Sequence, residues 1–326
     1  MIEGKKMANS NIFIVGGAGY IGSHMVKMAE KNGYNVITLD NLSTGHRESV
    51  KYGVFEYCDI HDSIKLGELF KKYAPIAVMH FSAFSIVSES VRNPYKYYYN
   101  NVAGTLNLLK IMVENNCKNF IFSSTAAVFG EPEYIPIDEK HPKKPINPYG
   151  KSKLMVESFL EDFDREYGLK YIIFRYFNAS GHDTDGELME LHNPETHLLP
   201  LIKQAADGIR ENIKIFGTNY DTDDGTCVRD YIHVSDICRA HLLGLEYLLK
   251  EKKSNDFNLG NGKGFSVKKI ISKYKEISKK EFEVIEADRR EGDPAILIAS
   301  SKKAKNILGW VSEISNIDDI IRSILL

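Results

Sequence analysis

Two residues that could transfer a proton lie in the stretch NPYGKSKLMVE, residues 147–157, where Tyr149 precedes Lys153 by four positions. Side chains four apart lie on the same face of a helix, so the Lys153 ammonium is expected near the Tyr149 phenol. A phenol has a pKa of about 10, and a nearby positive charge lowers that pKa by stabilising the phenolate. The pair could therefore act as a general acid and base. Because the chain contains 18 tyrosines, the spacing alone is weak evidence, and its meaning depends on the surrounding elements.

A glycine-rich turn follows the first apolar run, in the stretch IFIVGGAGYIGSH. Gly16, Gly19 and Gly22 recur at every third position, which allows a tight turn and a close approach of the backbone to a pyrophosphate. The amides at the start of the following helix would bind that anion. Asp40 ends the next apolar run, where its carboxylate can accept both hydroxyls of a ribose and would repel a 2′-phosphate. The pattern predicts a dinucleotide site that prefers NAD to NADP.

Short apolar runs alternate with longer amphipathic stretches through the first half of the chain. The apolar runs are NIFIVG, NVITLD, VFEYCD, IAVMHF, NFIFSS and YIIFRY, and the main amphipathic stretches cover residues 20–32, 63–73, 94–115 and 148–167. Continuously apolar strands that alternate with helices indicate a parallel sheet covered by helices on both faces. We therefore expect an α/β fold, with a doubly wound parallel sheet of the Rossmann type and a smaller C-terminal α/β domain for the substrate.

The domain boundaries follow from a change of pattern after Asn178, where loops rich in Gly, Asp and Asn replace the regular alternation. We expect residues 1–10 to be a disordered extension and residues 11–180 to form the NAD-binding domain. Residues 181–326 would form the substrate-binding domain. Part of 228–262 is expected to return to the first domain, because it contains a further strand and helix.

Composition excludes several classes of function. The net charge is −2 and the charged residues are interspersed, which argues against a partner that is a nucleic acid or an anionic membrane. No segment approaches the ~18 apolar residues of a membrane span. The four cysteines are far apart and lack metal-site spacing, so we expect reduced thiols and a cytoplasmic protein. His182, His192 and His197 also lack a recognised metal-binding spacing, so no metal is expected.

Taken together, the glycine turn, the strand end SSTAAVFG and the Tyr149–Lys153 pair resemble the extended short-chain dehydrogenase/reductase family. The resemblance is closest to its members that epimerise nucleotide sugars at carbon 4. It covers nearly the whole chain and runs through GGAGYIGSH, LDNLSTGH, HFSA, NPYKYYYNNVAGT, FIFSSTAAVFG, NPYGKSKLMVE, RYFN, GTCVRDYIHV and RREGDPA.

This resemblance implies a UDP-glucose 4-epimerase activity, in which UDP-galactose and UDP-glucose interconvert through a 4-keto sugar and NAD stays bound. Tyr149 would take the proton of the hydroxyl at carbon 4, Thr125 would hydrogen-bond the reacting oxygen, and Lys153 would support Tyr149. The NAD site of the family corresponds to Gly16, Gly19, Tyr20, Ile21, Gly22, Asp40, Asn41, Asp59, Ile60, Phe81, Ser82, Asn100, Ser123, Tyr149, Lys153 and Tyr176. Its nucleotide-sugar contacts correspond to Thr125, Tyr149, Asn178, Leu198, Phe216, Arg229, Arg290, Asp293 and Leu297.

Two features of the second half bear on the substrate. Arg229 and Arg290 suit a diphosphate because guanidinium groups bind phosphate oxygens in a bidentate manner. Leu297 stands where a bulky Tyr in family members accompanies use of glucose alone. The smaller side chain leads us to expect room for an acetamido group, so UDP-N-acetylhexosamines are candidate substrates.

The short-chain dehydrogenase/reductase scaffold also supports functions other than 4-epimerisation. A 4,6-dehydratase needs an acidic residue in the positions that follow the residue with the catalytic hydroxyl. Here Ala126 and Ala127 occupy those positions. A non-catalytic NAD sensor would not need both Tyr149 and Lys153. An alcohol dehydrogenase that exchanges NAD would leave VRDYIHV and RREGD without a nucleotide to bind. Two alternatives stay open: another UDP-sugar 4-epimerase, such as a UDP-glucuronate 4-epimerase, and the non-catalytic NAD sensor.

The helix that begins at Pro148 also predicts self-association. A helix that packs on a core needs only one apolar face, but the apolar residues of this helix lie on more than one side. They are Leu154, Met155, Phe159, Leu160 and Phe163. One side is expected to contact another subunit, as in family homodimers.

Overall fold

The computed structural model describes residues 10–290 and 293–326, and the chain divides into two compact units. The first unit takes the chain up to Val128, then Pro145–Arg175 and Cys238–Phe257, and the second unit takes Phe129–Lys144, Tyr176–Ile237 and Asn258–Leu326. Of the expected extension at 1–10, only Ser10 is among the described residues. Ser10 is buried, and its carbonyl oxygen accepts a hydrogen bond from the Asn35 amide at 3.1 Å.

The first unit is built on a seven-stranded sheet in the order β10-β6-β5-β4-β1-β2-β3. Strand β1 pairs in parallel with both β2 and β4, and the pairs β2/β3 and β4/β5 are also parallel. The chain thus runs outward from β1 in both directions, which confirms the predicted doubly wound fold and creates a switch point at the carboxyl ends of β1 and β4. The strands are β1 (Asn11–Val15), β2 (Asn35–Asp40), β3 (Val54–Tyr57), β4 (Ala77–His80), β5 (Asn119–Thr125), β6 (Lys170–Tyr176) and β10 (Asn255–Leu259).

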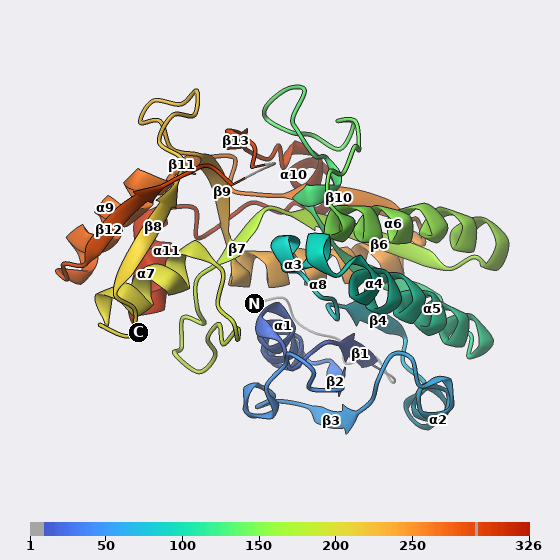
Figure 1. Cartoon of the computed structure of the whole chain (residues 1–326). Coiled ribbons are helices and arrows are strands. Elements are labelled where there is room, and N and C mark those ends of the chain that lie inside the picture. Colours follow the sequence, from blue (N-terminus) through green and yellow to red (C-terminus); the bar gives the residue numbers. More distant parts are fainter. Residues whose placement is uncertain (1–9, 291–292) are drawn as a thin grey trace. The chain divides into compact units, whose positions relative to one another are not determined.

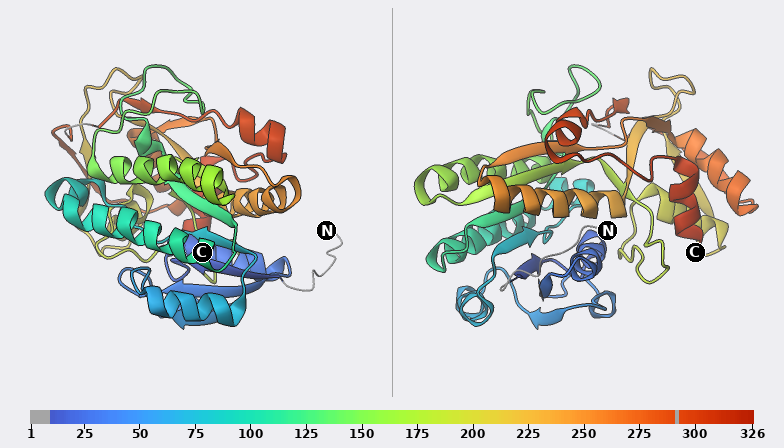
Figure 2. Two further views of the ribbon diagram at one scale, coloured as in Figure 1. Left: turned by 90° about the vertical axis from the view of Figure 1, so that its right-hand side faces the viewer. Right: turned by 180° about the vertical axis from the view of Figure 1, so that it is seen from behind.

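Helices cover both faces of this sheet because its strands are apolar on both sides. Phe13 and Val15 pack with residues of α2, α5 and α6 in one buried cluster, whereas Ile12 and Ile14 are also buried and alternate to the opposite face. Figure 1 shows α5 and α6 side by side, and α8 comes forward in the view from behind in Figure 2. The helical segments of this unit are α1 (Tyr20–Lys31), the 3-10 turn η1 (Arg47–Ser49), α2 (Ser63–Tyr73), α3 (Val87–Arg92), α4 (Pro94–Tyr97), the π-helical turn η2 (Tyr98–Gly104), α5 (Thr105–Glu114), the 3-10 turn η3 (Ala126–Val128), α6 (Pro148–Tyr167) and most of α8 (Val234–Glu251).

The second unit has smaller sheets. Strand β9 (Val228–His233) pairs with β11 (Gly264–Ser266) in antiparallel fashion and with β13 (Ile296–Leu297) and β7 (Asn178–Ser180) in parallel. A separate parallel pair joins β8 (Asn212–Phe216) to β12 (Glu283–Ala287). A second buried cluster gathers apolar residues of α7 (Leu198–Ala206), α9 (Val267–Ser278) and α11 (Ile317–Leu325), and α10 (Lys302–Leu308) lies near the end of the chain.

No helix in the described ranges is both long enough and apolar enough to cross a membrane.

Candidate active site

The turn between β1 and α1 has the geometry expected of a dinucleotide site. Gly16 has a φ of +81°, and a Cβ there would lie 2.4 Å from the Ser82 amide nitrogen. A Cβ on Gly22 would lie 2.1 Å from the Gly16 carbonyl oxygen, so only glycine lets α1 begin this close to the strand. Gly19 is the N-cap of α1, and the first turn of that helix has no acidic side chain. The exposed amides and small residues fit the pyrophosphate of NAD.

Asp40 closes this turn from the end of β2. Its two carboxylate oxygens accept hydrogen bonds from the Ala18 amide at 2.9 Å and the Leu42 amide at 2.8 Å. Burial raises the pKa of this carboxyl, and the two amides act in the opposite direction. Each oxygen keeps a further lone pair, so Asp40 can hold the turn and still accept ribose hydroxyls.

The other predicted NAD residues of the first unit lie at or just beyond the same strand ends. Asn41 donates to Asp59 at 2.7 Å, and the Phe81 and Ser82 amides donate to the Val15 carbonyl at 2.7 Å and 3.1 Å. Tyr20 and Ile21 open α1, Ile60 is buried after β3, Asn100 lies in η2, and Ser123 is buried in β5. The structure brings these residues together at the carboxyl edge of one sheet. Tyr176 ends β6 and belongs to the second unit.

Tyr149, the candidate general acid and base, is placed by the start of α6. Asn147 caps this helix by accepting from the Gly150 amide at 2.8 Å, and Pro148 occupies the first turn. Tyr149 follows Pro148 in this first turn, and its ring meets that of Tyr97 edge-on, with 6.5 Å between the ring centroids. Burial raises the pKa of Tyr149, and the hydrogen bond from Thr125 lowers it by a smaller amount.

Lys153 lies one turn later in α6, and its contacts differ from the expectation. Its ammonium donates to the Ser123 carbonyl at 2.8 Å and lies 4.7 Å from the Phe122 ring centroid. Burial lowers the pKa of Lys153 to about 7, against the opposing influence of Glu157. Burial thus raises the pKa of Tyr149 and lowers that of Lys153, an effect that the sequence pattern did not reveal.

A buried ionic network behind Lys153 was missed by the sequence analysis. Glu157 accepts from Ser124 at 2.6 Å and from two nitrogens of Arg175 at 2.8 Å each. The third nitrogen of Arg175 donates to Asp256 at 2.6 Å. The available signals were weak: a glutamate four residues after Lys153, and an arginine inside the apolar run YIIFRY.

A second missed residue is Asn101, which is 2% exposed within the π-helical turn. Its side chain bonds both the amide and the carbonyl of Phe84, at 2.9 Å and 3.0 Å, and donates to Ser152 at 3.1 Å. Asn101 thereby joins the segment after β4 to the first turns of α6. The family resemblance points instead to its neighbour Asn100.

Apart from Thr125 and Tyr149, which belong to the first unit, the predicted nucleotide-sugar residues lie in the second unit, where five of them form two groups. In the first group Arg229 donates to Asp293 at 2.5 Å, and Leu297 lies opposite Arg229 in the β9/β13 pair. In the second group the Arg290 guanidinium lies 3.9 Å from the Phe216 ring centroid. Asn178 and Leu198 are the first residues of β7 and α7. Glu291 and Gly292, from the stretch RREGDPA, lie outside the described residues.

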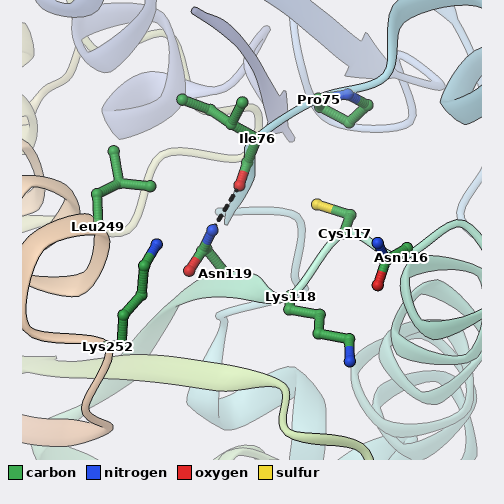
Figure 3. Close-up of a pocket in the computed structure, with 8 residues that line it drawn as sticks. All are labelled: Pro75, Ile76, Asn116, Cys117, Lys118, Asn119, Leu249 and Lys252. Atoms are coloured by element: carbon green, nitrogen blue, oxygen red, sulfur yellow. Dashed lines mark hydrogen bonds between the residues drawn. The ribbon is translucent and has the colours of Figure 1, made fainter.

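A hollow of about 470 Å³ lies at the opposite end of the first unit's sheet. Figure 3 shows it between the residues that precede β4 and β5 and the end of α8, with Asn119 donating to the Ile76 carbonyl at 2.7 Å. Its lining includes Cys117, Lys118 and Lys252, and none of the predicted site residues. Ligands of doubly wound sheets bind at the carboxyl ends of the strands, so this hollow does not belong to the site.

Comparison with known proteins agrees with this geometry. Residues 12–260 match the model of the NAD dependent epimerase/dehydratase family. The chain belongs to this family. It is 48% identical over 304 residues to the UDP-glucose 4-epimerase of Rhizobium meliloti, covering 93% of each chain. It also superposes on the Brucella ovis UDP-glucose 4-epimerase solved in complex with NAD, with a TM-score of 0.95, 46% identity and 97% of each chain covered.

A further solved relative is the UDP-Glc/GlcNAc 4-epimerase of Campylobacter jejuni. It is 42% identical, has a TM-score of 0.85, and the match covers 97% of this chain and 98% of that one. These relatives confirm the predicted resemblance to extended short-chain dehydrogenases/reductases that epimerise nucleotide sugars.

Proposed function

We propose that this chain is an NAD-dependent UDP-glucose 4-epimerase that interconverts UDP-galactose and UDP-glucose. The observation that carries the proposal is the placement of Tyr149 and Lys153 in the first turns of α6, where the Lys153 ammonium bonds the Ser123 carbonyl of β5, in the unit that also holds the glycine turn. Relatives with this name align over nearly the whole chain, so both the chemistry and the substrate class have support.

Tyr149 acts as the base that removes the proton from the hydroxyl at carbon 4. NAD, held by the glycine turn and Asp40, would supply the hydride acceptor for carbon 4 and the donor that returns the hydride to the opposite face of the sugar. Thr125 hydrogen-bonds the reacting oxygen, which keeps that oxygen within reach of Tyr149 as the carbonyl forms. In the reverse step Tyr149 returns the proton to the same oxygen, so no proton or electron is lost over one turnover.

The amine of Lys153 is held by its hydrogen bond to the Ser123 carbonyl. Burial lowers the pKa of this amine to about 7, so its charge depends on pH near neutrality. The positive charge of bound NAD adds to that of Lys153, and both favour the phenolate of Tyr149. Burial acts in the opposite direction, because it raises the pKa of Tyr149.

The nucleotide part of the substrate is bound by the second unit in this proposal. Arg229 and Arg290 supply guanidinium groups to the diphosphate. Asp293 keeps the fork of Arg229 oriented through its 2.5 Å hydrogen bond, and the Phe216 ring supports Arg290 from one face.

The breadth of sugar use depends on Leu297 in this proposal. Leu297 is next to Arg229 through strand pairing, and a leucine leaves more room there than a tyrosine would. We expect UDP-N-acetylglucosamine to be a substrate as well. Turnover of UDP-glucose without any turnover of the N-acetylated sugar would contradict this part.

We also infer a homodimer and a cytoplasmic location. Leu160 is buried in the core and Phe159 and Phe163 pack against it, whereas Met155 is 46% exposed on α6 and Leu106 is 43% exposed on α5. A second copy covering this face would bury both side chains. All four cysteines are free and buried, which suits a reducing compartment.

The deciding experiment follows the anomeric proton signals of UDP-galactose by NMR with purified protein and no added NAD. Conversion to UDP-glucose, lost in the Tyr149→Phe variant, would support the proposal together with retention of the cofactor. No conversion even after NAD is supplied would overturn it. UDP-glucuronate would then be tried, as the substrate of the alternative epimerase.

A further inference from the structure

Two histidines and two glutamates of the second unit converge in the segment that leads into α7. Glu190, His192, Glu195 and His197 each offer one ligand atom, and these four atoms lie within 4.8 Å of one another. They are outside both groups of predicted nucleotide-sugar residues. His182, the third histidine of the rejected sequence motif, is elsewhere, with its amide donating to Ser323 at 3.1 Å.

Glu190 is the centre of the cluster. Its side chain is 3% exposed, and the same oxygen, Oε1, lies 2.9 Å from His192 Nδ1 and 2.7 Å from His197 Nδ1. A second carboxylate, that of Glu195, lies 3.2 Å from His197 Nδ1. Two imidazole nitrogens therefore point at one buried carboxylate oxygen instead of being spread over separate partners.

These distances are close to those around a small divalent ion. Zinc binds histidine nitrogens and carboxylate oxygens at about 2.0–2.2 Å, so four tetrahedral ligands stand about 3.3 Å apart. The histidine–carboxylate spacings of 2.7–3.2 Å lie just below that value, and the widest separation, within 4.8 Å, closes to it by movement of the side chains on an ion. Two imidazoles and two carboxylates also suit zinc better than magnesium, which prefers oxygen ligands and retains its waters.

The segment around the cluster is suited to hold it in place. The Asp183 amide donates to the Leu188 carbonyl at 3.1 Å, and Leu188 is buried two residues before Glu190. At the other end, Glu195 accepts from the backbone amides of Thr196 and His197 at 2.7 Å each. His197 is itself the N-cap of α7, so a ligand bound here would fix the start of that helix.

We propose that Glu190, His192, Glu195 and His197 form a binding site for one Zn²⁺ ion, separate from the residues that carry the epimerase chemistry. The ion would replace the protons that the imidazoles otherwise share with Glu190, and it would tie residues 190–197 to the first turn of α7. The site uses adjacent residues of one segment, so it needs no contribution from the first unit.

The test is calorimetric titration of Zn²⁺ into the full-length chain, freed of any histidine tag and of metal by chelation and dialysis. We expect one ion per chain, and loss of a ligand in His192→Ala should weaken binding by at least ~10-fold, the lower end of what outer-shell changes cost. His46→Ala is the matched control, because His46 also faces a glutamate, Glu48 at 3.8 Å, but belongs to no group of possible metal ligands within residues 10–290 and 293–326. That control should bind as the unsubstituted chain does.

His192 is 32% exposed, so its replacement should not unfold the chain, and circular dichroism verifies this. Glu190→Gln is a second variant that loses a ligand, and it keeps the volume of the side chain. Binding of Co²⁺ with ligand-field bands and no thiolate charge-transfer band would support the histidine and carboxylate ligands over the cysteines. Absence of stoichiometric Zn²⁺ binding, or equal binding by His192→Ala, would overturn the site and leave an ion-paired cluster. Epimerase activity is not the readout, so failure here leaves the proposed function untouched.

Discussion

At the scale of single residues, the balance between burial and hydrogen bonding at Tyr149 leads to a kinetic prediction. Thr125 lowers the pKa of Tyr149 against a larger rise caused by burial. Thr125→Ala should therefore move the rising limb of the kcat–pH profile to higher pH and reduce kcat by roughly 10²-fold. Thr125→Ser keeps the hydroxyl and should keep the profile. Identical profiles for the Ala and Ser variants would contradict the role of Thr125.

The buried network behind Lys153 leads to a prediction about stability. Glu157 and Arg175 are 2% and 1% exposed, so Glu157→Gln leaves an arginine charge without its buried partner. We expect a loss of about 3–5 kcal/mol in the free energy of unfolding. Asp256 bonds the same arginine but is 28% exposed. Asp256→Asn should therefore lower the free energy of unfolding by only about 1 kcal/mol or less. Urea denaturation of the two variants decides whether burial makes this difference.

His233 leads to a prediction about pH. It is fully buried, and burial lowers its pKa to about 4, although Asp236 and Asp183 act in the opposite direction. The unfolded chain takes up a proton near pH 6.5 and the folded chain does not until about pH 4, so stability is lost as pH falls through this window. The loss should reach about 3 kcal/mol from this residue.

His233→Gln should flatten the dependence of unfolding free energy on pH between 6.5 and 4, relative to the unsubstituted chain. His46, whose side chain is 36% exposed, is replaced by Gln as the control for the loss of an imidazole. This control should keep the pH dependence of the unsubstituted chain. An unchanged slope in His233→Gln would show that other groups set the acid sensitivity.

At the scale of elements, the packing of α1 on β1 depends on Gly22, which carries a hydrogen atom where any other residue has a side chain. Gly22→Ala would put a Cβ 2.1 Å from the Gly16 carbonyl oxygen, which is backbone and cannot move aside cheaply. We expect destabilisation of at least about 1–3 kcal/mol and loss of bound NAD. Retention of NAD at full occupancy by this variant would contradict the account of the turn.

Gly67→Ala is the matched control within α2. A Cβ there meets nothing within 4 Å, and the helix gains a residue of higher helical propensity. We expect stabilisation of about 0.5–1 kcal/mol, measured by the same denaturation experiment. The pair separates the intrinsic effect of glycine in a helix from the effect of close packing.

At the scale of the whole molecule, the exposed apolar residues of α5 and α6 predict the oligomeric state. Leu106→Glu combined with Met155→Glu should convert a dimer to a monomer, because two charges per chain would be buried in the interface. Ile64→Glu, at a position that is 78% exposed on α2, should leave the dimer intact. Light scattering gives the mass in each case. A monomeric unsubstituted chain, or a dimer that survives the double substitution, would exclude this interface.

Local patterns in the chain were enough to predict the parallel sheet, the glycine turn, the place of Asp40 at the end of β2 and the helix that carries Tyr149 and Lys153. Each of these depends on residues close together in sequence, where the period of a strand or helix determines which side chains share a face. Asn147 and Pro148 likewise mark the start of α6 by their own chemistry. The segment Phe129–Lys144, which groups with the second unit although it precedes α6, has no such local pattern.

The direction of the Tyr149 pKa, the Ser123 partner of Lys153 and the Glu157–Arg175–Asp256 network were decided by tertiary structure. Arg175 is 18 residues from Glu157 and 81 from Asp256 along the chain, so no short-range period relates them. Burial is a property of everything that surrounds a group, and here it opposes the effect expected from a neighbouring charge. The meeting of His192 and His197 on Glu190 has the same origin, because the path of an irregular loop follows from packing and not from a repeating pattern.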